Sequence, residues 1–146
     1  MLTFHYREES ANGEMILRPR LAMCINGDIL SASGSALLDS GADRSIIPSY
    51  VAEVIGLEKG KPIETSGVGG NTAGYESTIE VTLFDKDGKT QEIAKLPVYV
   101  LYNFHEVVIG RKAMFNRFRI TFEEFNNKIV LEEIPKDKTY GTVASS

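Results

Sequence analysis

A carboxylate, a hydroxyl and a glycine follow one another at Asp39, Ser40 and Gly41, directly after the apolar residues Leu37 and Leu38. The apolar run predicts the end of a buried strand, and the glycine permits a sharp turn there. A carboxylate at the edge of a core is costly to ionise unless neighbours hydrogen-bond it, and the hydroxyl and the backbone amides that follow are such neighbours. The segment is therefore a candidate half of an active site built on Asp39.

Asp-Ser-Gly alone does not separate a catalytic role from an ordinary turn in which Asp39 caps backbone amides. Two later segments bear on the choice because of their order along the chain. They are a glycine-rich tip, Ser66-Gly67-Val68-Gly69-Gly70, and an apolar run that enters a turn, Val107-Val108-Ile109-Gly110-Arg111.

Taken together and in this order, the three segments resemble the retroviral-type aspartic proteases, the retropepsins, from about Arg18 to Leu131. The family signature is Asp-Thr/Ser-Gly-Ala, a glycine-rich flap and an Ile-Gly-Arg segment, and Ser40 stands where threonine is common. The resemblance implies an all-β, closed, barrel-like acid protease fold with one or two short helices. It also implies a homodimeric aspartic endopeptidase.

The chemistry gives a separate reason to expect a dimer. Peptide hydrolysis by carboxylates needs one ionised group to activate a water and one protonated group to polarise the scissile carbonyl. A single Asp39 cannot do both, whereas two copies held close share one proton because like charges so near cannot both ionise. A short chain with one such motif therefore predicts an isologous homodimer with the site on its two-fold axis.

The resemblance assigns roles to the neighbours of Asp39. Ser40 and Gly41 support the dyad, with the Ser40 hydroxyl bonding across the dimer beneath it, and Gly41, Ala42 and Asp43 contact the substrate. Asp43 and Arg111 are joined within one subunit, since a guanidinium can bind a carboxylate at two points. Two unrelated surface charges are the alternative for this pair.

The glycine-rich tip is a candidate flap. Its glycines make it mobile enough to close over an extended peptide, and in the family the residue that matches Val68 reaches the substrate through a water. A plain hairpin turn is the alternative. The flap residues are Ser66, Gly67, Val68, Gly69 and Gly70.

Three features depart from the family pattern or stand outside it. Arg44 occupies a place where retroviral enzymes often have a second acidic residue. This difference bears on which substrate side chains the binding subsite there prefers. In retropepsins the termini interleave into a dimer sheet, for which residues 2–6 and 129–131 are candidates here. His105 beside Glu106 suggests proton transfer, although a loop histidine is more often solvated.

Alternating apolar residues predict the elements that hold these segments in place. The expected strands are 2–6, 16–25, 29–38, 61–66, 75–84, 91–94, 96–102, 107–109, 118–122 and 128–133.

The connections between these strands are predicted from turn and helix signals. The sequence indicates a polar loop at 8–14, a tight primed turn at Asn26-Gly27 and two short helices. One helix covers Ser49–Ile55, with Pro48 suited to a first helical position and Gly56 as its stop, and the other covers 111–116. Residues 1–134 are expected to form one protease domain, and 135–146 a polar, flexible tail.

Composition narrows the class of protein. The chain has 146 residues, 42% hydrophobic and 25% charged, with a net charge of −4 and no basic stripe, so we expect one globular domain and no nucleic-acid partner. Its longest apolar run is too short to span a bilayer, so no membrane is expected. The single cysteine, Cys24, cannot form an internal disulfide, which predicts a reducing, cytoplasmic setting. With both histidines far from it, no metal-ligand spacing appears, so no metal and no cofactor are expected.

The leading hypothesis is a homodimeric aspartic endopeptidase that acts on extended segments of peptides or proteins. A second hypothesis keeps the fold and drops the chemistry, leaving a dimerisation or peptide-binding module in which Asp39 is structural. A third is a generic β-barrel binder of small molecules, which a monomeric state would favour.

Overall fold

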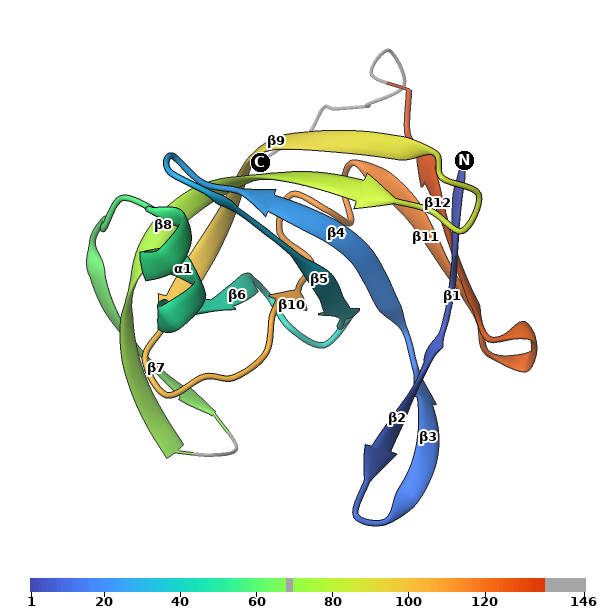
Figure 1. Cartoon of the computed structure of the whole chain (residues 1–146), viewed down its shortest axis with the longest axis horizontal. Helices are drawn as coiled ribbons and strands as arrows, with labels where there is room; N and C mark the ends of the chain where they lie inside the picture. Colours follow the sequence, from blue (N-terminus) through green and yellow to red (C-terminus); the bar gives the residue numbers. More distant parts are fainter. Residues whose placement is uncertain (68–69, 136–146) are drawn as a thin grey trace.

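The computed structural model describes residues 1–67 and 70–135, in which the chain forms twelve strands, one α-helix and one short 3-10 helix. The predicted all-β class is confirmed (Figure 1). The strands are β1 (Leu2–His5), β2 (Arg7–Ala11), β3 (Glu14–Arg18), β4 (Arg20–Asn26), β5 (Ser31–Leu38), β6 (Ser45–Pro48), β7 (Pro62–Gly67), β8 (Gly70–Phe84), β9 (Thr90–Leu101), β10 (Val108–Ile109), β11 (Phe118–Glu123) and β12 (Lys128–Glu133).

Six strands form a closed circuit. β4 pairs with β5, β5 with β10, β10 with β6, β6 with β9, β9 with β8, and β8 again with β4, while β7 adds to the far end of β8. The pairs β5–β10 and β6–β9 are parallel. Closure turns one face of each strand inward, so alternate residues such as Ile79, Val81 and Leu83 of β8 are buried in the core.

A second sheet is built from the two ends of the described chain, in the order β1–β12–β11. β1 lies antiparallel to β12, with Leu2 opposite Leu131 and Phe4 opposite Ile129, and all four side chains are buried. The segments that the sequence suggests for a dimer sheet therefore already pair with each other inside one chain. The outer strand β11 is left at the edge.

Residues 8–14 are not the polar loop that the sequence predicts. β2 and β3 form a hairpin whose turn, Asn12-Gly13, has φ angles of 52° and 81°, values typical of the primed turns that Asn-Gly favours. Neither strand alternates, since β2 is polar nearly throughout and the apolar residues 15–17 of β3 follow one another, because this hairpin projects from the body and buries little (Figure 1). The predicted strand 16–25 is in fact two strands, interrupted at Pro19.

Two connections also differ from expectation. The turn after β4 is longer than the two residues predicted at Asn26-Gly27, because Asn26 pairs with Ser31 and the Gly27 amide donates to the Leu30 carbonyl at 2.9 Å. The predicted strands 91–94 and 96–102 form one strand, β9. Its register against β8 shifts near Lys95, which has a φ of 56°. The break that the sequence suggests is therefore an irregularity within one continuous strand.

The helix α1 (Ser49–Ile55) has the predicted bounds and ends at Gly56, whose φ of 81° is left-handed. Pro48 precedes it as the N-cap in an extended conformation rather than taking the first helical position. The second predicted helix, 111–116, is wrong. This segment is a series of turns, and Ala113, with a φ of 69°, does not fit a regular helix.

Val68, Gly69 and most of the predicted tail, 136–146, lie outside the described residues. Within the described residues, no helix has both the length and the apolar character needed to cross a membrane.

Candidate active site

The loop that contains Asp39 leaves the end of β5 and is anchored by strands on both sides. The Leu38 amide donates to the Pro19 carbonyl at 2.9 Å, and the Asp39 amide donates to the Ile109 carbonyl at 2.9 Å. Leu38 and Ile109 are both buried. The position of Asp39 is therefore fixed by the closed sheet and not by the loop itself.

The carboxylate of Asp39 is half-buried at this loop. Its Oδ1 accepts a hydrogen bond from the Gly41 amide at 2.8 Å, and no second donor reaches the carboxylate from the described part of the chain. A Cβ at Gly41 would lie 3.2 Å from the same Oδ1, so glycine keeps the space beside the carboxylate open. Ser40 is exposed and Ala42 is half-buried.

A second loop, which follows β10, holds the first one through its backbone. The Arg111 amide donates to the Ala42 carbonyl and the Lys112 amide to the Asp43 carbonyl, both at 2.9 Å. The predicted segments around Asp39 and Arg111 are therefore in direct contact, although they are far apart in the sequence.

Two residues make this contact close. The buried Ser45 accepts a hydrogen bond at its Oγ from the Gly110 amide at 3.1 Å. A Cβ at Gly110 would lie 2.5 Å from the Arg44 carbonyl oxygen and 2.7 Å from that of Ala42, so only glycine fits without a shift of the backbone. Ser45 is not among the residues that the sequence singles out, since a serine after Arg44 has no distinctive pattern.

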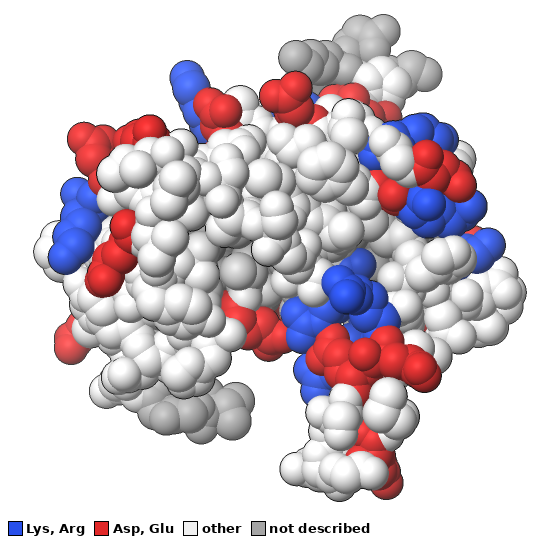
Figure 2. Space-filling view, viewed as in Figure 1, with Lys and Arg blue, Asp and Glu red and all other residues white. Residues whose placement is uncertain are grey.

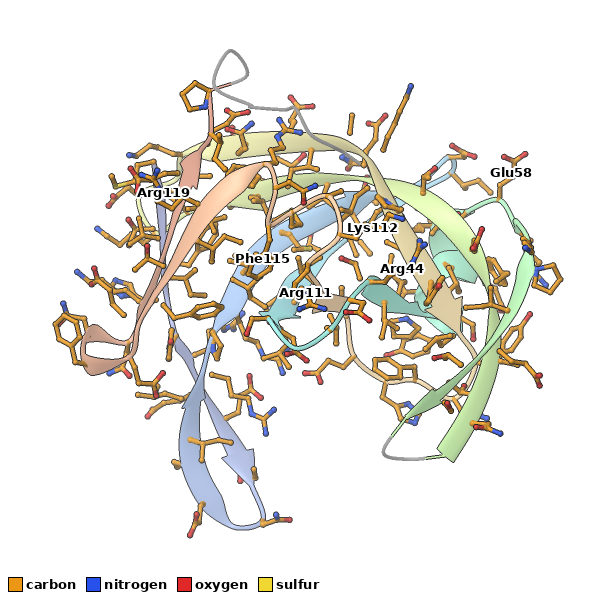
Figure 3. The ribbon with its side chains drawn as sticks, turned by 180° about the vertical axis from the view of Figure 1, so that it is seen from behind. Arg44, Glu58, Arg111, Lys112, Phe115 and Arg119 are labelled. Atoms are coloured by element: carbon orange, nitrogen blue, oxygen red, sulfur yellow. The ribbon has the colours of Figure 1, made fainter. Side chains whose placement is uncertain are left out.

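Asp43 and Arg111 form an ion pair. Figure 3 labels Arg111 beside Lys112, on the loop after β10. Their side chains are 83% and 53% exposed, so water screens the attraction and the pair contributes little to the stability of one chain. The backbone bonds described above, and not this pair, hold the two loops together. The ion pair leaves the guanidinium and the carboxylate at the surface beside the Asp39 loop.

Arg44 turns away from the Asp43–Arg111 pair. Its guanidinium lies over the ring of Tyr99, 4.7 Å from the ring centre, as in a cation–π contact. Arg44 also lines a pocket of about 560 Å³ between residues 57–61 and the strands β8 and β9. Asp39 does not line this pocket, so this hollow is not the place where the candidate chemistry would occur.

Charged side chains gather where the β2–β3 hairpin leaves the body (Figure 2). Arg20 of β4 pairs with both Glu9 of β2 and Glu106 of the loop before β10. The hydrogen bond from Arg20 holds the pKa of Glu9 below its ordinary range. Glu106 is thus engaged by an arginine, while the side chain of His105 is exposed, so the geometry assembles no acid–base pair from these two neighbours.

The candidate flap is the end of a long hairpin of β7 and β8. The strands pair from Pro62 opposite Tyr75 to Gly67 opposite Gly70, which places the glycine-rich tip at the far end of the hairpin. Near its base, Tyr75 is buried and its ring lies 6.2 Å from that of Tyr102. Ser66, Gly67 and Gly70 belong to the described strands, whereas Val68 and Gly69 do not.

Metal ligation would need several donor side chains in one place. The described residues contain no group of three or more histidine, cysteine, aspartate or glutamate side chains placed to hold a metal ion.

Comparison with known proteins gives structural likeness alone. No protein-family model and no curated protein matches the chain. One similar solved structure is EIAV protease in complex with the inhibitor HBY-793, with 23% identity and a TM-score of 0.45 over 74% of this chain and 93% of that one. Another is the retroviral protease-like domain of Ddi1 from Leishmania major, with 17% identity and a TM-score of 0.49 over 83% and 97%.

Proposed function

We propose that this protein is an aspartic endopeptidase that acts as a homodimer, with Asp39 of each copy forming the catalytic pair. The observation that supports it most is the state of the Asp39 carboxylate. It is held rigidly at the end of a closed sheet, yet it is half-exposed and accepts one hydrogen bond, from Gly41. The remaining lone pairs of the carboxylate are therefore free to bind a water and to share a proton with a second carboxylate.

One copy of Asp39 does not complete the chemistry. When two copies meet, they share a proton, and the ionised carboxylate takes a proton from a water as that water attacks the scissile carbonyl. The protonated carboxyl donates its proton to the carbonyl oxygen. The tetrahedral intermediate then collapses and the C–N bond breaks: the leaving nitrogen receives the proton of the pair, and one hydroxyl of the intermediate returns a proton to the pair as the new carboxyl group forms.

The proposed substrate is an extended segment of a peptide or protein. The space beside Asp39 that Gly41 leaves open would admit a substrate backbone, with Ala42 and Asp43 next along the same loop. The β7–β8 hairpin, with its tip from Ser66 to Gly70, would cover that backbone and pair with it. Ser40 would support the dyad from below.

The test is cleavage of an unbiased peptide mixture by the wild type, by Asp39→Asn and by Asp28→Asn, between about pH 4 and 7, where a shared-proton pair is sensitive to pH. Asp39→Asn retains the size of the side chain and removes the charge. Asp28 is exposed in the loop before β5 and provides the matched control. We expect wild type and Asp28→Asn to cleave, and Asp39→Asn to lose at least a thousandfold in rate.

Two other outcomes would contradict the proposal. Undiminished cleavage by Asp39→Asn would show that another group performs the chemistry. A dimeric wild type without cleavage over the whole pH range would favour the catalytically silent binding module.

A further inference from the structure

The first half of β5 has a free edge. β4 pairs along the whole of β5, but on the other side β10 pairs only at Leu37 and Leu38. The Leu38 amide bonds on the β4 side, whereas the Leu37 amide bonds away from it, to the Val107 carbonyl at 2.9 Å. Because these directions alternate along a strand, the backbone groups of Ser33 and Ser35 also point away from β4. No backbone partner meets them there among the described residues.

An apolar recess of about 90 Å³ opens beside this edge. Its apolar walls are the side chains of Met23, Ile25, Ala32, Val51 and Val107. Gly34 also lines it, and a Cβ at Gly34 would meet nothing within 4 Å, although Ala32 and Ala36 lie on the same face of β5. Since protein interiors are close-packed, this unfilled recess is a place for an apolar side chain from outside.

A larger hollow of about 300 Å³ continues from the recess. Both are lined by Ser35, Val51 and Val107, so they lie side by side along the edge of β5. Tyr50 at the start of α1 and His105 also line the hollow. The free edge therefore has room beside it for a further strand, with one side chain directed into the recess.

Exposed apolar side chains border the hollow. Tyr50 and Val54 are one turn apart on α1, while Ile29 and Leu30 directly precede β5, and all four are between 55% and 74% exposed. The amides of Ile29 and Leu30 both donate to the Ile55 carbonyl, which holds their loop against the end of α1. Figure 2 shows few charged side chains over α1 and β5. Exposed apolar groups that gather in this way mark a contact surface.

Glu53 adds a negative charge to this surface. It is exposed on α1, next to Val54, and forms no ion pair with another described residue. Arg20 and Glu106, which line the hollow, already pair with each other. The charge left without a partner at this surface is therefore acidic, and it favours a basic residue in whatever binds there.

We propose that this surface binds an extended segment of a partner protein. The surface, here called the β5 groove, consists of the open edge at Ser33 and Ser35, the recess at Gly34 and the exposed side of α1. The segment would add to β5 as a strand in line with β10, through backbone hydrogen bonds. It would place an apolar side chain in the recess and a lysine or arginine near Glu53.

The β5 groove is separate from the candidate active site. At Leu37 the Val107 carbonyl takes the edge of β5, and β10 then covers the edge as far as Asp39. A segment in the groove therefore ends before it reaches the Asp39 carboxylate, and the partner would be held there without being cut. The inference needs neither proteolysis nor a second copy of the chain.

The first experiment selects peptides from a random displayed library, about twelve residues long, so that each can span a strand. The immobilised protein is the full chain with Asp39→Asn, which prevents the proposed chemistry from cleaving what is captured. We expect the captured peptides to have apolar residues at alternate positions and at least one lysine or arginine. They are then synthesised with a fluorescent label, and their dissociation constants are measured by anisotropy.

Variants in the same background locate the binding site. Gly34→Val fills the recess at a position where a Cβ meets nothing, so it should fold normally and weaken binding about tenfold or more. Val54→Ser removes an apolar group from α1 and should weaken binding about threefold or more. Phe125→Ser is the matched control, because Phe125 is 83% exposed on the 3-10 helix between β11 and β12, far from α1 (Figure 1). It should leave the dissociation constant unchanged.

Two further measurements test the charge and the backbone contact. Glu53→Lys should weaken binding of the selected peptides and strengthen binding of the same peptides with glutamate in place of lysine or arginine. Hydrogen exchange followed by NMR should show the amides of Ser33 and Ser35 exchanging about tenfold or more slowly when peptide is bound.

Three results would overturn the inference. They are a library that yields no captured peptide, peptides whose binding is unchanged by both Gly34→Val and Val54→Ser, and Ser33 and Ser35 amides that exchange equally fast with and without peptide. Peptides held in the cleft at Asp39 would give the second and third of these results. Loss of the β5 groove would leave the proposed endopeptidase intact, and failure of proteolysis would leave the groove intact.

Discussion

Asp39 and Asp85 each follow an apolar strand, and their carboxylates have different surroundings. Asp85, after β8, is buried, and its Oδ1 accepts the amides of Asp87 at 2.9 Å and Lys89 at 2.8 Å, while its Oδ2 accepts the Thr3 amide at 3.2 Å. Asp85 is therefore a structural turn residue, which is the role that the sequence left open as the alternative for Asp39. The Asp39 carboxylate, with one donor, retains an open side on which chemistry is possible.

The surroundings of Asp85 predict a pH dependence of stability. Burial alone would raise the pKa of Asp85, but the three backbone donors and Lys89 outweigh it and lower the pKa below its ordinary 3.8. A lowered folded pKa stabilises the fold above the unfolded pKa, and that stability is lost as pH falls through the folded value. Asp85→Asn should remove this acid-dependent loss. It should also lower the free energy of unfolding at pH 7 by about 1–3 kcal/mol, because its amide faces the Thr3 donor.

The measurement is urea unfolding followed by circular dichroism from about pH 2.5 to 7, since the chain has no tryptophan. Asp87→Asn is the control, because Asp87 lies in the same turn with its side chain 57% exposed. It should change stability by less than about 0.5 kcal/mol at pH 7. Equal effects of the two substitutions would show that the turn does not depend on the Asp85 carboxylate.

At the level of single residues, the order of the motifs along the sequence is enough to single out Asp39, Asp43 and Arg111. Ser45 is not predictable in this way. Its hydroxyl matters because the Gly110 amide lies 3.1 Å away in space and 65 positions away in sequence, and no local pattern encodes that proximity.

Among the elements, the β7–β8 hairpin depends on one glycine at its base. Gly74 of β8 lies opposite Ile63 of β7 and Leu101 of β9, and a Cβ there would be 1.9 Å from the Val100 carbonyl oxygen. Alanine would force β8 away from β9. We therefore expect Gly74→Ala to lower the free energy of unfolding by about 1–3 kcal/mol, measured by urea unfolding.

Gly34 provides the matched control for this substitution. It lies in β5, where a Cβ would meet nothing within 4 Å, and its φ is not left-handed. Gly34→Ala should change stability by less than about 0.5 kcal/mol or raise it slightly, since alanine restricts the unfolded chain. Comparable losses from both substitutions would mean that glycine matters in these strands for reasons other than space.

The elements themselves were largely predictable, because most strands bury one face and so alternate clearly. The exceptions have physical reasons. The β2–β3 hairpin buries little and therefore has no apolar period, and the dipeptide Asn12-Gly13 at its turn does not by itself predict the two strands. The segment after Arg111 has the apolar residues of a helix, but Met114 and Phe115 are placed by successive turns, with Ala113 in a left-handed conformation.

At the scale of the whole molecule, the closed circuit of strands came from the family resemblance and not from periodicity. Its parallel pairs β5–β10 and β6–β9 join segments that alternation alone cannot match. The pairing of β1 with β12 inside one chain was not expected either. The sequence of β1 fits β12 of its own chain and β12 of a second copy equally well, so the sequence does not decide between them.

The need for two carboxylates leads to a prediction about mixed dimers. If each copy supplies one Asp39, a dimer of one wild-type chain and one Asp39→Asn chain lacks the shared-proton pair and should be inactive. Adding a threefold excess of Asp39→Asn to a fixed amount of wild type, with free exchange of chains, should leave about a quarter of the original wild-type homodimers. Peptide cleavage by the mixture should fall to the same fraction.

Asp28→Asn, added in the same excess, distinguishes loss of chemistry from a general effect of added protein. Its chains retain Asp39, so mixed dimers stay active and total cleavage should rise with the chains added. The mixture should be left long enough for exchange, and exchange itself can be followed with a mass-labelled chain. If exchange is complete and the Asp39→Asn chain does not lower cleavage, one carboxylate suffices and catalysis by a pair of Asp39 residues is wrong, even though the protein is a dimer.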